Sequence, residues 1–181
     1  MSAKQQLLVQ NFIHTYLEIS PEAEATLTAY ALETWRPRSP MSQDLLLLGE
    51  VAATGKTRAA AVMAAICRKA FVVSGRAAPA YLMKLLAEEG HPTLIVDDAD
   101  NLMLDPTSEV FKKLRENSHL GFKILTSSHP FRRDVAMRAR YITVTLTGTI
   151  IRNEIPRVLG KGFEQACTEI QQALHAEDTY E

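Results

Sequence analysis

The chain has 181 residues, of which 46% are hydrophobic and 23% charged, and its formal net charge is −1. This length and composition predict one substantial hydrophobic core and exclude a largely disordered chain. The near-zero net charge excludes a globally basic protein, so any contact with nucleic acid would need a local patch. The N-terminal residues lack the apolar core of a secretion signal and no apolar run approaches a membrane span, so we expect a cytoplasmic protein with no membrane partner.

The first 40 residues predict two helices. Apolar residues recur at helical spacing over residues 3–18. Ser20-Pro21-Glu22 then supplies an N-cap, a proline at the first helical position and an acid in the first turn of a second helix. We expect this helix to run to about Trp35, and we assign residues 1–40 to an N-terminal helical preface.

From residue 44 onward, short apolar runs alternate with helical patterns. This alternation predicts an α/β fold of three α/β/α layers, with a five-stranded, mostly parallel sheet covered by helices on both faces. The expected strands are 45–48, 70–73, 93–96, 122–125 and 141–146, and the expected helices are 56–68, 78–89, 106–118 and 131–138. We assign residues 41–148 to this core and residues 149–181 to a C-terminal helix, starting near 152 or 156 and running to about 176, with an acidic tail.

The segment LLLLGEVAATGKT, from Leu45 to Thr57, is typical of a phosphate-binding loop. Strand, loop, Gly-Lys-Thr and helix follow in the order that lets backbone N–H groups and a helix N-terminus surround a phosphate. Lys56 would reach the β- and γ-phosphates of ATP, and the Thr57 hydroxyl would bind Mg²⁺. A chance Gly-Lys-Thr before an Ala-rich helix is the alternative. The expected nucleotide-binding residues are Gly49, Glu50, Ala53, Thr54, Gly55, Lys56, Thr57 and Arg58.

The first glycine of this loop is irregular. The usual spacing places it where this chain has Glu50, with Gly49 one residue earlier. Either the loop is one residue longer or the first glycine has been replaced, and the sequence leaves both open.

Asp97 and Asp98 end the third strand, at the edge of an open α/β sheet where ligands bind. A phosphate loop supplies one Mg²⁺ ligand and needs a carboxylate to hold the water shell of the ion, and Asp97 is placed for that role. Asp98 faces another direction and could polarise the attacking water. Two solvated acids at the end of a strand are the alternative.

Polar and basic residues follow the fourth strand. Thr126-Ser127-Ser128 would place hydroxyls beside the γ-phosphate or the attacking water, unless the segment is simply a Ser-rich turn. Residues 131–161 then contain seven Lys or Arg against two acids. A solvated basic face and a contact with the DNA backbone are two readings of this bias. The third is an arginine supplied to the γ-phosphate of a neighbouring subunit, for which Arg138 or Arg140 is best placed.

On these residues the chain resembles the AAA+ branch of P-loop ATPases over residues 44–146. LIVDDAD and ILTSSHP are similar to the Walker B and sensor motifs of superfamily 3 helicases, with Ser128 in the place of an asparagine. The longer stretch from ISPEAEATLTAYALETW through GKT to LIVDDAD resembles the ATPase domains of phage- and plasmid-borne replication or primase-associated proteins. The resemblance implies ATP at a subunit interface of a ring or filament, with Asp98 as water activator, Ser128 as sensor and Arg138 or Arg140 acting in trans.

Three departures from the family pattern concern one γ-phosphate: Glu50 for glycine, Asp98 for the more common glutamate, and Ser128 for asparagine. They weaken the expectation of fast hydrolysis more than that of binding. The resemblance therefore implies a Mg²⁺-dependent, AAA+-like ATPase in DNA replication or phage and plasmid DNA metabolism, acting as a helicase-type motor or loader. DNA and a replication protein are its candidate partners. The alternative is a catalytically weak or inactive nucleotide-binding module that controls assembly with a partner protein, and a small-molecule kinase is a third reading that the acid pair disfavours.

Overall fold

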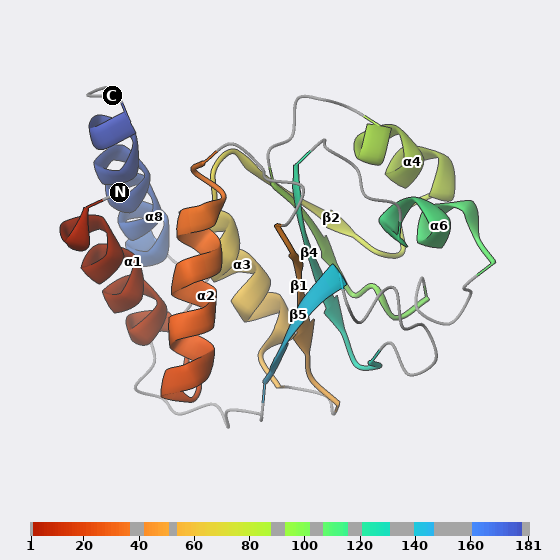
Figure 1. Ribbon diagram of the computed structural model, residues 1–181, viewed down its shortest axis with the longest axis horizontal. Coiled ribbons are helices and arrows are strands. Elements are labelled where there is room, and N and C mark those ends of the chain that lie inside the picture. Colours follow the sequence, from red (N-terminus) through yellow and green to blue (C-terminus); the bar gives the residue numbers. More distant parts are fainter. Residues whose placement is uncertain are drawn as a thin grey trace.

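The computed structural model describes residues 2–36, 42–50, 54–87, 93–101, 107–115, 121–130, 140–146 and 161–178. Its elements, labelled as in Figure 1, are α1 (Ala3–Tyr16), α2 (Pro21–Glu33), β1 (Asp44–Leu48), α3 (Lys56–Ile66), β2 (Ala70–Ser74), α4 (Pro79–Ala87), β3 (Thr93–Asp97), α6 (Glu109–Arg115), β4 (Phe122–Ser127), β5 (Tyr141–Thr145) and α8 (Lys161–Asp178). The helix predicted at 131–138 and the end of the acidic tail lie outside the described residues.

The five strands form one sheet in the order β2-β3-β4-β1-β5, and all of the described pairings are parallel. The carboxyl ends of all five strands therefore lie at one edge of the sheet. β1 lies between β4 and β5 in this order, so the segment that follows β1 is next to the one that follows β4. This sheet, with helices on both faces, confirms the predicted three-layer α/β/α fold.

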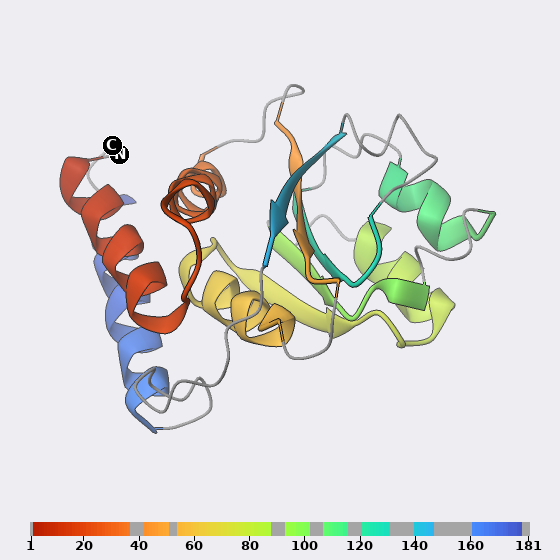
Figure 2. The ribbon, with the colours of Figure 1, turned by 90° about the horizontal axis from the view of Figure 1, so that it is seen from below.

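Alternate residues of the strands supply the two sides of the core. Leu45 and Leu47 of β1 pack with α3 and the terminal helices, whereas Leu46 packs with α4 and α6 on the opposite face. Successive side chains of a strand point to opposite faces, so a sheet covered on both sides needs an unbroken apolar run. The leucine run of β1 meets this need, and every residue of the strand is buried. Figures 1 and 2 show the two helical layers on either side of the sheet.

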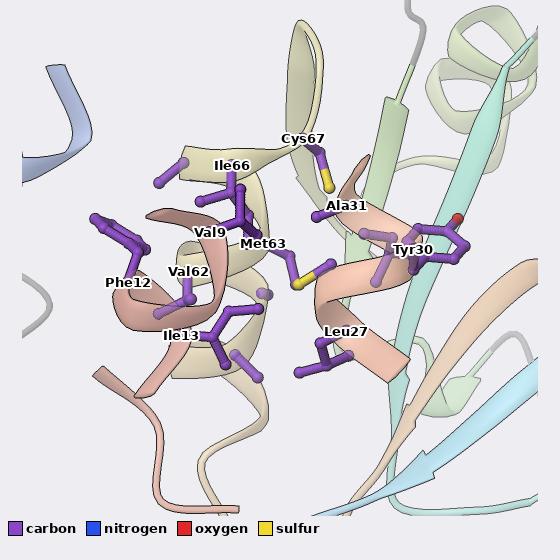
Figure 3. Close-up of a cluster of buried hydrophobic side chains, with 14 of the residues drawn as sticks. Val9, Phe12, Ile13, Leu27, Tyr30, Ala31, Val62, Met63, Ile66 and Cys67 are labelled. Atoms are coloured by element: carbon purple, nitrogen blue, oxygen red, sulfur yellow. The ribbon is translucent and has the colours of Figure 1, made fainter. Parts of the chain in front are cut away.

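The helices at the two ends of the chain share a core with α3. Figure 3 shows apolar side chains of α1, α2 and α3 pointing toward one another, including Val9, Leu27 and Met63, all fully buried. α8 joins this group through Phe163, whose ring centroid lies 4.9 Å from that of Tyr16. The predicted preface and C-terminal helix thus pack directly on the helix that follows the predicted phosphate loop.

Local signals set the helix ends. Ser2 caps α1 through a capping box with Gln5. Ser20 caps α2, with Pro21 at the first helical position, as the sequence predicts. The carboxyl ends of α2 and α3 are joined, because the Trp35 indole donates to the carbonyl of Ile66 at 2.8 Å. No helix in the described part of the chain is both long and apolar enough to span a membrane.

Candidate functional site

The carboxyl edge of the sheet gathers most of the residues that the sequence singles out. β3 and β4 are neighbours, and so are β4 and β1. Gly49 follows β1, Asp97 ends β3, and Ser128 follows β4. The strand order therefore brings the predicted phosphate loop, the acid pair and the Ser-rich turn together, at the kind of edge where open α/β sheets bind ligands.

Lys56 connects the loop to the turn after β4. Its Nζ donates to the carbonyl oxygen of Gly49 at 2.8 Å and to the hydroxyl of Ser128 at 2.9 Å, although Ser128 is 72 residues away in sequence. Lys56 is the first residue of α3, after Gly55, whose φ of +85° is a conformation that favours glycine. Thr57 follows in the first turn of α3 with an exposed side chain. An ammonium group and a helix N-terminus thus lie together at the sheet edge.

The packing around the loop after β1 shows whether position 49 or position 50 needs a glycine. A Cβ added to Gly49 would lie 1.9 Å from Thr54 Oγ1 and 3.0 Å from Lys56 Cγ, so there is no room for a side chain. The Gly49 N–H also donates to the Ser127 carbonyl at 2.9 Å, which holds the residue against β4. Glu50, by contrast, is exposed. Close packing thus requires glycine at position 49 and not at 50, which favours the longer loop.

Replacing Gly49 by alanine is expected to disrupt the loop. The added methyl group would displace Thr54 or Lys56, and we expect nucleotide affinity to fall at least about tenfold, since small displacements in a binding site have large effects. Titration calorimetry with ATP measures this loss. Gly162→Ala is the matched control, because a Cβ at Gly162 meets no atom within 4 Å; a similar loss of affinity in that variant would contradict the explanation.

Thr54 is a buried residue of the same loop. It is 5% exposed, and among the described residues its hydroxyl has no hydrogen-bond partner. A buried polar atom without a partner is costly and uncommon in native proteins. The hydroxyl lies against Gly49, since a Cβ built there would be 1.9 Å from it, so Thr54 packs inside the loop.

Thr126 orients the acid pair. Its hydroxyl, fully buried, donates to Asp97 Oδ1 at 2.6 Å and accepts from the Asp98 N–H at 2.8 Å. The hydroxyl of Thr126 is therefore bound to the two acids. This differs from the expectation that the hydroxyls of Thr126-Ser127-Ser128 lie beside the γ-phosphate or the attacking water. Ser128 supplies the hydroxyl that reaches Lys56.

Asp98 has a partner that the sequence did not reveal. Its Oδ2 lies 2.6 Å from Arg76 Nε, in an ion pair whose side chains are 37% and 72% exposed, respectively. Asp98 adopts a φ of +58°, and Gly75 packs against its backbone so closely that a Cβ at Gly75 would lie 2.3 Å from the Asp98 oxygen. Asp98 thus turns away from the direction of Asp97 and faces the segment after β2.

A third acid, Asp100, was also missed. Its Oδ1 accepts from the Ser128 N–H at 2.6 Å and lies 2.8 Å from Ser127 Oγ and 3.1 Å from His129 Nδ1. Partial burial alone would raise the pKa of Asp100, but the hydrogen bonds from Ser128, His129 and Ser127 together lower the pKa to about 2. Asp100 is therefore ionised at neutral pH. The third acid of the DDAD motif was its signal in the sequence.

Arg140 lies at the opposite edge of the sheet. Its Nε and Nη2 are 3.0 and 2.9 Å from Asp44 Oδ2, where β1 begins. Asp44 is fully buried and also accepts from the Lys123 N–H at 2.9 Å, with Lys123 Nζ 3.8 Å away. Arg140 thus has a structural partner within its own subunit. Arg138 lies outside the described residues, and an arginine acting in trans stays a prediction.

The remaining predicted residues are placed as follows. Arg58 points toward the end of α1, with its Nη1 3.5 Å from the carbonyl oxygen of Tyr16. Ala53 lies outside the described residues.

In the part of the chain that the structure describes, no group of three or more His, Cys, Asp or Glu could hold a metal ion. The predicted Mg²⁺ ligands, Thr57 and Asp97, are one hydroxyl and one carboxylate, a set that suits Mg²⁺ held mainly by phosphates and water.

Neither a family model nor a curated protein matches the chain. Among solved structures, DnaI is similar with a TM-score of 0.48 and 16% sequence identity, over 82% of this chain and 100% of that one. JCV helicase is similar with a TM-score of 0.49 and 12% identity, over 98% of this chain and 62% of that one. This chain thus spans less than two thirds of the JCV helicase chain. These likenesses concern the fold and not the chemistry of the site.

Proposed function

We propose that this chain binds ATP with Mg²⁺ at the carboxyl edge of its sheet and hydrolyses it. The observation that carries this proposal is the position of Lys56 Nζ, 2.8 Å from the Gly49 carbonyl and 2.9 Å from the Ser128 hydroxyl. The lysine of the phosphate loop and the polar residue after the fourth strand meet at one point, beside the strand that ends in Asp97. A γ-phosphate is the chemical group that uses all three.

The proposed roles follow from the residue types and their partners. Lys56 binds the β- and γ-phosphates, and Thr57 and Asp97 hold Mg²⁺, whose chemistry is to neutralise charge on the phosphates. The Thr126 hydroxyl keeps the Asp97 carboxylate oriented at 2.6 Å. Ser128 responds to the γ-phosphate through its contact with Lys56. Asp98 orients the attacking water once its carboxylate is released from Arg76.

Features of the loop support a phosphate ligand independently of the motif. Gly49 has no room for a Cβ, and Gly55 has a left-handed backbone conformation. A loop that brings its backbone close to a ligand needs glycine at such points. The residues present therefore fit a nucleoside triphosphate.

The second candidate function is a nucleotide-binding module with weak or no turnover, whose ATP state controls assembly with a partner. The ion pair between Asp98 and Arg76 favours it, because Oδ2 of the Asp98 carboxylate is bound to arginine at 2.6 Å and so is not directed at a water molecule. The two candidates differ in whether the Asp98 carboxylate separates from Arg76 when ATP is bound.

Turnover by Asp98 and Arg76 variants tests the two candidates. We expect Asp98→Asn to lower Mg²⁺-dependent ATP turnover at least about 100-fold with ATP affinity retained, since an amide cannot accept the proton of a water. Arg76→Ala should raise turnover severalfold, because it releases the carboxylate. The control is Glu109→Gln, which neutralises an exposed acid on α6. Unchanged turnover in Asp98→Asn would refute the catalytic role, and ATP binding without turnover in every variant would establish the second candidate.

The role in DNA replication or phage and plasmid DNA metabolism is the finer part of the proposal and rests on the motif resemblance. A helicase-type motor or loader would be a ring or filament, with ATP at the interface between copies of the chain and an arginine such as Arg138 contributed in trans. The turnover assay with single- and double-stranded DNA tests the link to DNA. Light scattering with an ATP analogue tests assembly, and a strict monomer at high concentration would contradict an arginine acting in trans.

A further inference from the structure

Asp100 has no part in the proposed chemistry, yet it is bound to the residue that contacts Lys56. One oxygen of its carboxylate contacts three successive residues after β4: the Ser127 hydroxyl at 2.8 Å, the Ser128 N–H at 2.6 Å and the His129 ring at 3.1 Å. Hydrogen bonds to an ionised acceptor are stronger than those between neutral groups. This carboxylate thus joins three residues of the turn, which the Ser127 hydroxyl also bridges through the N–H and the carbonyl of His129, each at 2.9 Å.

Holding the Ser128 backbone also places its side chain. The Ser128 hydroxyl is separated from its own backbone by one rotatable bond, which adopts few staggered positions. With the peptide fixed by Asp100, the hydroxyl lies 2.9 Å from Lys56 Nζ. The contacts therefore run without a break from Asp100 through Ser128 to Lys56, and from there to the Gly49 carbonyl at 2.8 Å.

The other two acids of the motif are bound elsewhere. Asp97 is held by Thr126, and Asp98 by Arg76 on the side of β2. Asp100 is less exposed than Asp98, at 22% against 37% of the side chain. Its acceptor oxygen is surrounded by donors of the turn, so it faces protein and not an approaching nucleotide.

We propose that Asp100 is a positioning residue for nucleotide recognition: by holding the Ser128 peptide it places the Ser128 hydroxyl against Lys56 and so sets how strongly the site distinguishes ATP from ADP. This inference rests on the proposed function, because the distinction requires a γ-phosphate at Lys56. Loss of Asp100 releases the Ser128 peptide, and the Ser128 hydroxyl is then no longer held against Lys56.

A double-mutant cycle tests the positioning role. The quantity measured is the dissociation constant for ADP divided by that for a non-hydrolysable ATP analogue, both with Mg²⁺. It is measured in the wild type, Asp100→Asn, Ser128→Ala and the double variant. We expect each single variant to lower the ratio about fivefold to tenfold with ADP affinity nearly unchanged, and the double variant to lower it no further, because both changes act through one hydroxyl. Glu109→Gln, the exposed-acid control, should keep the wild-type ratio.

The outcomes separate this proposal from the proposed function. A wild-type ratio in Asp100→Asn, or effects that add in the double variant, would overturn the positioning role while ATP binding stands. A wild-type protein that binds neither nucleotide would overturn the proposed function and this proposal together. If Asp100→Asn does not fold, the NMR signal of the Ser128 backbone amide in the wild type provides the test. Its chemical shift should change when the ATP analogue binds and not when ADP binds, and equal changes would overturn the proposal.

Discussion

Replacing Lys56 by alanine is expected to lower ATP turnover at least about 100-fold, the loss typical for removing one preorganised donor from a reacting group. The physical reason is that Lys56 is the cation at the meeting point of the loop and the turn after β4, within 2.9 Å of both Gly49 and Ser128. ATP affinity should fall as well, since in the proposed function the same ammonium binds the phosphates before and during the reaction. Steady-state turnover and titration calorimetry measure the two effects.

Lys112→Ala is the matched control for this variant. Lys112 is a lysine on α6 whose ammonium pairs with Glu109 at the surface, and its side chain is 45% exposed. The Lys112→Ala substitution removes the same charge and the same methylene groups as Lys56→Ala, but from a helix on the other face of the sheet. Equal losses in both variants would show that the effect is one of net charge and would refute the specific role of Lys56.

Replacing Asp44 by alanine is expected to destabilise the protein by about 3–5 kcal/mol, the usual cost of breaking a buried ion pair by removing one partner. Asp44 is fully buried, and its carboxylate is shared by Arg140, which is 10% exposed, and Lys123, which is 5% exposed. For a chain of this size, a loss of that magnitude lowers the melting temperature by about 10 °C. Urea unfolding followed by circular dichroism gives the free energy directly.

Two further variants test whether buried charge is the reason. Glu109→Ala breaks an exposed ion pair with Lys112 and should cost less than about 1 kcal/mol. Asp44→Leu combined with Lys123→Met and Arg140→Met removes all three charges and should recover much of the loss, because apolar residues can replace a buried ion pair at little cost. If the triple variant is as unstable as Asp44→Ala, the loss comes from packing and not from buried charge.

The sequence predicts the sheet well because each strand has a local signal. All five observed strands overlap the expected ranges, and Ser20 and Pro21 begin α2 as predicted. The apolar run of β1 also predicts a strand buried on both faces, as observed. These features depend on side-chain period and capping, which are properties of neighbouring residues in the chain.

Contacts between strands are harder to predict, because they depend on the strand order. Arg76 reaches Asp98 because β2 lies beside β3, and Asp100 reaches Ser128 because β3 lies beside β4. Asp44 illustrates the same difficulty: a polar residue ahead of four leucines resembles an exposed strand start, and its burial comes from residues of β4 and from Arg140 just before β5. The roles of Lys56, Thr57, Asp97, Asp98 and Ser128 in ATP chemistry stay predictions.

The contacts of Lys56 have a consequence for how a nucleotide would enter. The Gly49 carbonyl and the Ser128 hydroxyl are oxygen acceptors at distances that a phosphate oxygen would also adopt. An arriving phosphate oxygen therefore meets an ammonium group that the protein already orders, so the lysine side chain loses little further conformational freedom on binding.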